Sequence, residues 1–470
     1  MIKSDNSHIS GTLSRRAMLR VLMGAGVLAG TGPILSTATR AADPQNVVVI
    51  GAGAAGLAAA QQLAAAGHRV QVIEGRDRIG GRILTSRQWQ GLPVDLGASW
   101  IHGAEDNPLT AIADTAGIER FQMDYDRLLV HATDGSILDQ GARQDTARLA
   151  KDIKRRLGGM RAGRCLVGAE TSLERFLTLQ MKPDRMTADR RNRFWYLMAA
   201  AKEHDYAADA SEMSLCRHDD DERFDGPDML FPGGYDQIAE ALAENLTIRT
   251  GVTVRAIRLT GGGVALETTG GRIAADRVIC TLPVGVLKDG GVRFEPGLPD
   301  DKLSALSGIG AGVMNKCVLR FNQVFWDPNS HMLGYVPAAR GQWVEWLNLH
   351  GTLGQPALMG FNVGRYAAEL EQLSDRDVAD QALTVLRKIH GNRVPEPTGV
   401  QVTRWSRDPF AMGAFSFAAT GMEKDARDTL AAPVENRIFF AGEATSIDYP
   451  GTVHGAILSG RRAAEDVSDS

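Results

Sequence analysis

The stretch from Gln45 to Glu74 reads QNVVVIGAGAAGLAAAQQLAAAGHRVQVIE, and it decides the fold of the chain. A β-branched run, 45–50, leads into the glycine turn 51–56, an alanine-rich helix follows, and a second apolar run ends at Glu74. The three glycines permit a tight turn, close approach of a pyrophosphate to the backbone, and close packing of helix on strand. The helix N-terminus offers free N–H groups to the anion, and an acid about 20 residues on suits a ribose hydroxyl. The stretch therefore predicts a strand-turn-helix-strand unit that binds a dinucleotide.

The composition is that of a globular protein large enough for two or three domains. The chain has 470 residues, 44% of them hydrophobic and 23% charged, with a formal net charge of −4. Because residues 1–40 carry an excess of arginine and lysine, the rest of the chain is more acidic than this net charge indicates. This balance argues against nucleic acid as a partner and favours cationic ligands.

The N-terminus has the pattern of a targeting segment. Ser14-Arg15-Arg16-Ala17-Met18-Leu19 precedes a glycine-rich apolar stretch, and the whole resembles a twin-arginine export signal. The apolar stretch, Val21 to Leu35, is too short and too broken by glycine to span a bilayer. We therefore expect residues 1–42 to be a signal and the protein to be exported to the periplasm by the export machinery. The alternative is a disordered basic tail.

The four cysteines do not form a metal-binding pattern. Cys165, Cys216, Cys280 and Cys317 are scattered without any Cys-x-x-Cys pair, so we expect no metal site. Cys280 and Cys317 lie in apolar runs and are interpreted as buried thiols. An exported protein can form a disulfide, but the spacing does not place one.

Further glycine-rich segments follow the opening unit. Gly80-Gly81-Arg82 again lets the backbone approach a ligand, and Arg82 can neutralise a phosphate. Leu96-Gly-Ala-Ser-Trp-Ile-His-Gly103 is a small-residue segment that suits a position flat against a ring system. With the glycine turn, these motifs make the chain resemble the flavin-containing amine oxidases over nearly its whole length after residue 44.

The resemblance implies the fold class and the cofactor, FAD. It predicts an α/β protein in which a Rossmann-like FAD-binding domain with the Gly-x-Gly-x-x-Gly turn is joined to an α+β substrate-binding domain. The FAD-binding domain is expected at 43–127, 232–300 and 403–467, and the substrate-binding domain at 128–231 and 301–402. The cofactor contacts that the resemblance implies are Gly51, Gly53, Ala55, Gly56, Glu74, Gly81, Arg82, Gly97, Ala98, Ser99, Trp100, Val254, Trp405, Gly442, Glu443, Thr452 and Val453.

Lys316 occupies an unusual place for a lysine. It lies between apolar neighbours in the run Met314 to Leu319, which reads as a strand. This segment resembles the family's strand whose lysine reaches flavin N5 through a water molecule. The alternative is a side chain that extends to solvent at the start of a strand.

The last motif begins the final helix. Arg437 to Glu443 reads as a strand that ends in a Gly-Glu turn, and Tyr449-Pro-Gly-Thr-Val453 begins a helix soon after it. A helix N-terminus beneath the flavin presents its positive dipole where negative charge accumulates on reduction. Core packing alone does not need both features together.

Two departures from the monoamine oxidases are informative. Their flavin is attached through a cysteine that aligns with Ala414, so the resemblance implies non-covalent FAD here. Their two cage tyrosines align with Phe415 and Thr452, and Tyr449 is expected to supply the missing aromatic face. His102 resembles the residue that related polyamine oxidases carry near the substrate amine, although a purely structural histidine is the alternative. The predicted catalytic residues are thus Lys316, Phe415, Tyr449 and His102.

The expected function is FAD-dependent oxidation of a primary or secondary amine, polyamine-like in character. Hydride passes to flavin N5, the imine hydrolyses to an aldehyde and an amine, and dioxygen yields hydrogen peroxide. The expected partners are therefore a small-molecule amine and dioxygen, while the oligomeric state is left open. Histone demethylation is disfavoured because the chain has no long coiled-coil insertion and an export signal precedes it.

Two other functions compete with this one. An L-amino-acid oxidase of the same family needs an arginine clamp for the substrate carboxylate, and Arg404 and Arg407 are available. A non-catalytic flavin-binding protein is the other alternative. A hydrolase is not supported, because the sequence has neither a Gly-x-Ser-x-Gly elbow nor a His-Glu-x-x-His motif.

Overall fold

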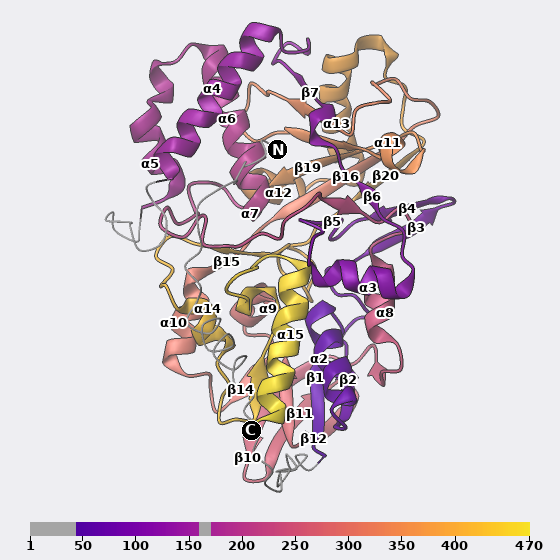
Figure 1. Ribbon diagram of the computed structural model, residues 1–470, viewed down its shortest axis with the longest axis vertical. Coiled ribbons are helices and arrows are strands. Elements are labelled where there is room, and N and C mark those ends of the chain that lie inside the picture. Colours follow the sequence, from indigo (N-terminus) through magenta and orange to yellow (C-terminus); the bar gives the residue numbers. More distant parts are fainter. Residues whose placement is uncertain (1–43, 159–170) are drawn as a thin grey trace, which may run out of the picture. The chain divides into compact units, whose positions relative to one another are not determined.

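The structure is a computed structural model that describes residues 44–158 and 171–470 (Figure 1). The predicted signal, residues 1–42, lies outside the described residues, as does Cys165. No helix in the described ranges combines the length and the apolar character that a membrane crossing needs.

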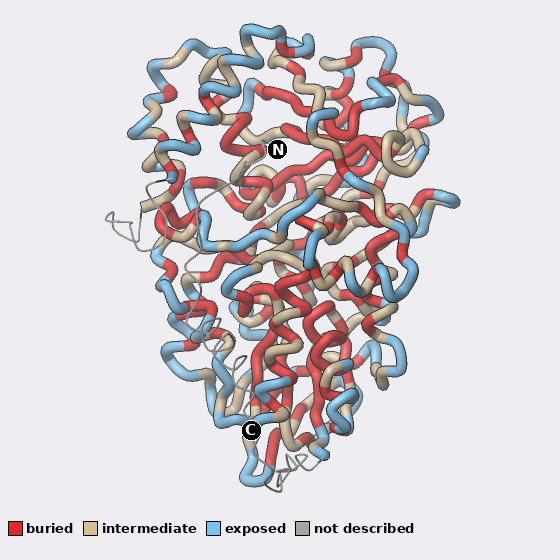
Figure 2. The backbone as a smooth tube through the Cα atoms, viewed as in Figure 1, coloured by how far each residue is buried: buried red, intermediate tan, exposed pale blue. Residues whose placement is uncertain are grey.

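A five-stranded parallel sheet carries the opening unit. Its strand order is β22-β13-β1-β2-β9, and every neighbouring pair runs parallel. The strands are β1 Asn46–Ile50, β2 Arg69–Ile73, β9 Ile248–Arg249, β13 Arg277–Cys280 and β22 Ile438–Phe440. The predicted strands at 45–50 and 69–73 are confirmed to within one residue. Because both faces of the sheet are covered, β1 reads as a continuous apolar run (Figure 2).

Helices cover one face of this sheet. Val47 and Val49 of β1 point into a core that they share with α2 Ala54–Ala65, α3 Pro108–Ala116, α8 Asp236–Ala243 and α15 Val453–Ser468. α15 lies beside α2 (Figure 1), and the two backbones meet at Gly460, where a Cβ would lie 2.1 Å from the carbonyl oxygen of Ala55. The predicted last helix is confirmed.

A smaller sheet covers the other face. Its order is β12-β11-β10-β14, with β10 Val254–Thr260, β11 Gly263–Thr268, β12 Gly271–Ala275 and β14 Arg293–Glu295. Val48 and Ile50, which alternate with the helix-facing residues of β1, share a second core with this sheet. The result is a three-layer arrangement of helices, parallel sheet and small sheet.

A six-stranded sheet forms the other main layer. Its order is β20-β16-β19-β18-β17-β7, antiparallel except for the last pair. The strands are β7 Leu128–His131, β16 Met314–Arg320, β17 Met332–Tyr335, β18 Glu345–Asn348, β19 Ala357–Val363 and β20 Gly399–Val402. α13 Asp375–His390 packs on this sheet through Val378, Ala382 and Leu386. The predicted strand that bears Lys316 is therefore confirmed.

The stretch after β7 is mainly helical. It contains α4 Gln140–Leu157, α5 Leu173–Met181, α6 Ala188–Met198, the π-helix η3 Ala199–Glu203 and α7 His204–Tyr206. α4 begins at Gln140, because the side chain of Asp139 accepts a hydrogen bond from the N–H of Ala142 and caps the helix there.

The remaining elements are short. They are β3 Thr85–Trp89, β4 Leu92–Asp95, β5 Trp100–Ile101, β6 Phe121–Gln122, η1 Tyr125–Arg127, η2 Pro183–Arg185, β8 Met229–Leu230, α9 Val284–Asp289, α10 Asp300–Gly308, β15 Ile309–Ala311, α11 Leu349–Leu353, α12 Gly364–Leu370, η4 Gly391–Arg393, β21 Ser416–Ala418, α14 Ala426–Ala431 and η5 Glu443–Thr445. The assignment of the two large sheets to a cofactor domain and a substrate domain, with the boundaries given above, stays a prediction.

The described cysteines include both free thiols and a disulfide-bonded residue. Cys280 and Cys317 are free and buried, as predicted. Cys216 is disulfide-bonded. Among the described residues, no group of three or more His, Cys, Asp and Glu is placed to hold a metal ion.

Candidate active site

The glycine turn lies between the end of β1 and the start of α2. Gly51 has a φ of +102°, and a Cβ there would lie 2.5 Å from Oγ1 of Thr281. A Cβ on Gly56 would come within 1.9 Å of the carbonyl oxygen of Gly51, so glycine is needed for the helix to pack on the turn. Among the described residues, nothing beyond the chain neighbours lies within 4 Å of the Cβ position of Gly53. This side of the turn is therefore open to a ligand.

The first turn of α2 is suited to an anion. Gly53 is the N-cap residue, and because it has no side chain it cannot cap the helix with a side-chain hydrogen bond. Ala55 lies in the first turn of the helix. The first N–H groups of a helix have no partner within the helix itself, and the helix dipole adds positive potential at the same place. A pyrophosphate group would satisfy both.

Glu74 stands beside this turn. Its Oε2 accepts a hydrogen bond from the N–H of Ala52 at 2.8 Å, and its Oε1 accepts one from the N–H of Arg76 at 2.8 Å. Each carboxylate oxygen keeps further acceptor capacity, which two ribose hydroxyl groups can use. Val254, the first residue of β10, is buried in the core that contains Ile73, close to where Glu74 leaves β2.

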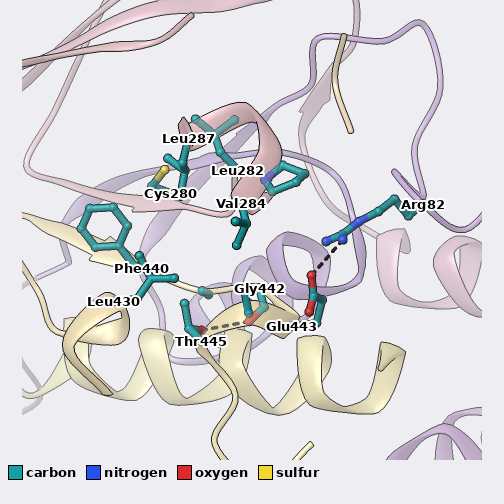
Figure 3. Close-up of a pocket in the computed structure, with 13 residues that line it drawn as sticks. Arg82, Cys280, Leu282, Val284, Leu287, Leu430, Phe440, Gly442, Glu443 and Thr445 are labelled. Carbon is teal, nitrogen blue, oxygen red and sulfur yellow. Dashed lines mark hydrogen bonds and ion pairs between the residues drawn. The ribbon is translucent and has the colours of Figure 1, made fainter. Parts of the chain in front are cut away.

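Arg82 is paired with Glu443 rather than left for a phosphate alone. Its Nη1 lies 2.8 Å from Oε1 of Glu443 (Figure 3). The same Nη1 also donates to the carbonyl oxygen of Ala414 at 3.0 Å. Glu443 also accepts hydrogen bonds from Oγ of Ser416 and from the N–H of Gly451. Burial by itself would raise the pKa of Glu443, but its cationic and hydroxyl neighbours outweigh burial and hold this pKa below the ordinary value. Glu443 thus links the segment Gly80-Gly81-Arg82 to the start of α15 through hydrogen bonds.

A pocket opens beside this ion pair (Figure 3). Its walls include Leu282, Pro283 and Val284, between β13 and α9, with Gly442 and Glu443 on the other side. Gly442 has a φ of +129°, and no described atom beyond its chain neighbours lies within 4 Å of its Cβ position. The backbone at Gly442 is therefore accessible to a bound molecule.

Lys316 is buried, and its ammonium group holds the segment 95–99. Its Nζ donates to the carbonyl oxygens of Asp95 at 2.7 Å and Gly97 at 2.5 Å, and to Oγ of Ser99 at 2.6 Å. Burial lowers the pKa of Lys316, and the nearby Asp95 carboxylate opposes this shift in part. Three acceptors match the three N–H bonds of an ammonium group, so the water-bridged contact to flavin N5 implied by the resemblance stays a prediction.

The same segment is held from a second side. Nε1 of Trp405 donates to the carbonyl oxygen of Leu96 at 3.0 Å. The N–H of Ala98 donates to the carbonyl oxygen of Arg82, and a Cβ on Gly97 would lie 1.9 Å from that oxygen. The structure therefore brings the predicted residues 97–99, Arg82, Lys316 and Trp405 together in one place.

An aromatic wall and a carboxylate lie on the Lys316 side of the six-stranded sheet. Lys316 is directly opposite Phe361 on β19, and Phe361 is directly opposite Glu345 on β18. Residues opposite each other in neighbouring strands project on the same face. Nζ of Lys316 lies 6.0 Å from the ring centroid of Trp100, and the rings of Trp100 and Phe361 are 5.6 Å apart. Oε2 of Glu345 lies 2.9 Å from Nδ1 of His204.

His102 continues this wall. Its ring stacks on Trp100, with 6.4 Å between the centroids, and its Nδ1 lies 3.2 Å from Oδ2 of Asp228. Asp228 also accepts hydrogen bonds from the hydroxyl of Tyr125 and from the N–H of Gly103. The imidazole is partly exposed, with 42% of the side-chain surface accessible.

The start of α15 brings Thr452 and Val453 into place. Thr452 is the N-cap residue, and its Oγ1 accepts a hydrogen bond from the N–H of Gly455. Phe415 lies against the Cβ position of Gly451, one residue before the cap. The ring of Tyr449, however, stacks on Phe224 with a centroid distance of 4.6 Å and an interplanar angle of 9°. The aromatic pair seen in the structure is Tyr449 with Phe224.

Sequence analysis missed four residues of this region: Phe224, Asp228, Glu345 and Phe361. Glu345 carried a usable signal, because a carboxylate between two tryptophans in an apolar run is an unusual strand residue. Asp228 and Phe224 carried none, since the partners of Asp228 are brought close by the pairing of β8 with β5, and the ring partners of Phe224 are Tyr449 and His454, far along the chain.

Comparisons with known proteins found a family model, curated proteins and solved structures that are similar to this chain. The family model described as flavin containing amine oxidoreductase matches residues 54–468. Polyamine oxidase 4 of Oryza sativa subsp. japonica is 35% identical over 447 residues, which are 93% of this chain and 91% of that protein. Probable polyamine oxidase 4 of Arabidopsis thaliana is 36% identical over 437 residues, 90% of this chain and 86% of that protein.

Other relatives are longer. Lysine-specific histone demethylase 1 homolog 3 of Oryza sativa subsp. indica is 36% identical over 90% of this chain, but the chain spans only about half, 54%, of that protein's length. Among solved structures, wild-type putrescine oxidase bound to putrescine matches with a TM-score of 0.74 and 20% identity, covering 91% of this chain and 99% of that one. The predicted α/β fold is confirmed by this likeness.

Proposed function

Because this chain belongs to the family of flavin-containing amine oxidoreductases, we propose that it oxidises amines that carry a second cationic nitrogen, as polyamines do. The products are an aldehyde, formed by hydrolysis of an imine, together with a smaller amine and hydrogen peroxide. When bound, the flavin supplies two-electron chemistry, in which it takes hydride from the α-carbon of the amine at N5 and is reoxidised by dioxygen.

The residues present fit FAD. The open backbone at Gly53 and Gly442, the uncapped start of α2 and the carboxylate of Glu74 match a pyrophosphate, a ribose and an extended linker. Ala414 has no nucleophilic side chain, which supports non-covalent attachment. Gly51, Gly53, Ala55, Gly56, Glu74 and Val254 would hold the adenosine diphosphate half, and the remaining predicted contacts would hold the ring half.

One observation carries the choice of substrate class: the buried row Lys316, Phe361 and Glu345 on one face of the six-stranded sheet. Adjacent strands lie about 4.8 Å apart, so Glu345 stands two strands, about 10 Å, from the lysine strand. An amine whose reacting nitrogen lies near Trp100 and Lys316 therefore has a carboxylate within reach of a second ammonium group. Burial and then the Asp228 carboxylate raise the pKa of Tyr125, and the carboxylates of Glu345 and Asp205 make smaller contributions in the same direction. This region favours cations.

The same geometry argues against an L-amino-acid oxidase. The two arginines available for a carboxylate clamp are turned to the α12–α13 connection. Arg404 donates to the carbonyl oxygens of Glu371 and Leu373 and pairs with Asp375, and Arg407 donates to the carbonyl oxygen of Glu371. Neither is left as a free clamp for a substrate carboxylate.

Export to the periplasm is part of the proposal. The motif Ser14-Arg15-Arg16 supports it, as does the disulfide bond at Cys216, because disulfides persist in oxidising compartments.

The test is a substrate panel on purified yellow protein. Spermidine, spermine, putrescine, a monoamine and two L-amino acids are mixed anaerobically with the protein, and bleaching of the flavin absorbance is followed. We expect the diamine and the polyamines to bleach the flavin at least 10-fold faster than the monoamine, and the amino acids not to bleach it. Rates should rise from neutral to mildly alkaline pH, because an ammonium group has no lone pair to expel hydride.

Three results would contradict the proposal. Bleaching by amino acids alone would indicate an amino-acid oxidase, and protein that no compound bleaches would indicate a flavin-binding protein without this activity. For the role of Glu345, Glu345→Gln should slow bleaching by putrescine without slowing bleaching by the monoamine. An equal effect on both would remove Glu345 from binding of the second cation.

A further inference from the structure

Asp228 is a carboxylate that no catalytic motif of the sequence marks. It directly precedes β8 Met229–Leu230, which pairs antiparallel with β5 through Trp100 with Leu230 and Ile101 with Met229. Continuing this register by one residue places Asp228 opposite His102. The hydrogen bond between Oδ2 of Asp228 and Nδ1 of His102 is thus set by strand pairing, and not by a flexible surface contact.

The contacts of Asp228 show that it is ionised. Its oxygens receive three hydrogen bonds, from His102, from the hydroxyl of Tyr125 at 2.7 Å and from the N–H of Gly103 at 2.9 Å. Burial would raise the pKa of this carboxyl, but the hydrogen bond from His102, followed by those from Tyr125 and Gly103, outweighs burial and lowers the pKa to about 2. An ionised carboxylate only accepts hydrogen bonds, so Nδ1 of His102 must carry the proton that they share.

This assignment decides what the other ring nitrogen can do. In a neutral imidazole one nitrogen donates and the other accepts, so a proton held on Nδ1 leaves a lone pair on Nε2. We propose that Asp228 is a positioning residue that fixes His102 in the Nδ1–H tautomer and thereby makes its Nε2 the proton acceptor for the substrate ammonium group.

The position of His102 supports this role. Its ring is parallel to Trp100 within 15°, and the Trp100 ring is in turn 6.0 Å from Nζ of Lys316. The imidazole therefore lies along the wall of the proposed substrate region, and its partial exposure lets a small molecule reach it. The other charged or titratable groups near it are Tyr125, His454 and, behind Trp100, Lys316.

The neighbours do not compete for this proton. His454 is buried, and burial, with a smaller contribution from the charge of His102, lowers the pKa of His454 to about 3. Burial and the Asp228 carboxylate raise the pKa of Tyr125, so its hydroxyl stays protonated and donates to Asp228. Lys316 is occupied by three hydrogen bonds to oxygen. Of these groups, His102 is the base that faces the substrate.

The step itself is a simple proton transfer, and it rests on the proposed function. One N–H bond of the substrate ammonium breaks and a bond from the proton to Nε2 forms, which leaves a neutral amine and an imidazolium. The imidazolium remains beside the carboxylate of Asp228, which stabilises its charge. The amine then has the lone pair that it needs to lose hydride.

The first measurement needs no substrate. Nitrogen-15 NMR of holoprotein labelled at histidine distinguishes a protonated ring nitrogen from an unprotonated one, and His102→Gln identifies the signals of His102. We expect Nδ1 protonated and Nε2 unprotonated in the wild-type protein. In Asp228→Asn the amide N–H can donate to Nδ1, and the tautomer should reverse. A wild-type His102 protonated on Nε2 alone would overturn the proposal.

The second measurement is anaerobic flavin reduction by the amine that the panel selects. Asp228→Asn should lower the reduction rate about 10- to 100-fold at pH 7. This loss should shrink toward pH 10, because an alkylamine has a pKa of about 10.4 and its neutral fraction therefore rises from well under 1% at pH 7 to about a quarter at pH 10. A defect that is only structural would not depend on the protonation of the substrate. Tyr125→Phe, which removes another hydrogen bond to the same carboxylate, is the matched control and should keep the wild-type pH profile.

A double variant shows whether Asp228 acts through His102. Because the two residues work as one unit, His102→Gln with Asp228→Asn should be no slower than His102→Gln alone. A full further loss in the double variant, or a loss in Asp228→Asn that is the same at every pH, would overturn the proposal. If no amine reduces the flavin even in the wild-type protein, the proposed function fails, whereas the NMR result on the tautomer still stands or falls by itself.

Discussion

Lys316 and Lys302 are two buried lysines with similar hydrogen bonding and different surroundings. Nζ of Lys302 donates to three carbonyl oxygens, those of Thr429, Leu430 and Ala432, near the C-terminal end of α14. Nζ of Lys316 donates to two carbonyl oxygens and to one hydroxyl group in the segment 95–99. Lys302 stabilises a helix end, whereas Lys316 stabilises a segment predicted to contact the flavin.

This pair allows stability and function to be separated. Replacing either lysine with methionine leaves buried carbonyl oxygens without partners, so we expect both Lys316→Met and Lys302→Met to lower the free energy of unfolding by about 3 kcal/mol. Only Lys316→Met should also slow flavin reduction and reoxidation, with FAD retained. Urea unfolding followed by fluorescence measures the first effect, and stopped-flow absorbance measures the second.

The outcome for Lys302→Met is the control. If this variant slows the flavin half-reactions as much as Lys316→Met does, loss of stability explains both results. If Lys316→Met leaves both half-reactions unchanged, Lys316 is a purely structural residue.

At the scale of single residues, sequence analysis predicted the candidate site residues that belong to recognisable motifs. Lys316 was predicted because an isolated lysine in an apolar strand is rare, and the glycines were predicted because turns and close backbone contacts demand them. Asp228 was missed because its contact with His102 depends on the register between strands more than 100 residues apart. Glu345 was missed because its position relative to Lys316 depends on a row of residues across three strands. Such pairing cannot be read from local spacing.

At the scale of elements, the contact between α2 and α15 holds the first and last parts of the chain together. α15 crosses α2 at Gly460, where a Cβ would lie 2.1 Å from the carbonyl oxygen of Ala55 in the first turn of α2. The same turn is predicted to bind the pyrophosphate. The spacing of the two helices therefore affects the cofactor site directly.

Gly460→Ala tests this dependence. The added methyl group has to push α15 away from α2, and overpacking of this kind costs about 1–3 kcal/mol. We expect the unfolding free energy to fall by about 2 kcal/mol and the dissociation constant for FAD to rise. Gly262→Ala, in the hairpin between β10 and β11, is the matched control, because no described atom beyond its chain neighbours is within 4 Å of its Cβ position.

Calorimetric titration of FAD into the apoprotein measures the affinity. Gly262→Ala should bind FAD as the wild-type protein does. A Gly460→Ala protein with unchanged affinity and unchanged stability would show that the helices can shift without affecting the turn.

Element types were predictable, and some ends were not. The strands of the opening unit followed from their β-branched residues and the glycine turn. The start of α4 is set by the cap at Asp139, whereas residues 140–144, which include Gly141, show no clear helical pattern by themselves. The stacking of Tyr449 on Phe224 depends on how the segment 219–226 lies against the start of α15, which local sequence does not determine.

At the scale of the whole molecule, the export signal can be tested by its two arginines. Twin-arginine signals are read by a receptor, so Arg15→Lys combined with Arg16→Lys should keep the full-length protein in the cytoplasm. Arg20→Lys removes one arginine outside the pair and should not. Immunoblots of periplasmic and cytoplasmic fractions from a bacterium with the twin-arginine machinery measure the distribution. Retention of the Arg20→Lys protein, or export of the double variant, would contradict the assignment.

The order of the strands in the parallel sheet means that the sheet can be completed only at the end of synthesis. β1 comes from residues 46–50, but β22, which pairs with β13, and α15, which covers α2, come from residues 438–468. Ribosomes add about 5–20 residues per second, so the proposed signal, residues 1–42, emerges about 20–90 s before the predicted FAD-binding site can be completed. During that interval the proposed signal is available to the translocase while the protein is unfinished. Export of the folded protein therefore requires that a chaperone on the signal, or slow recognition by the translocase, delays transport until the last helix is in place.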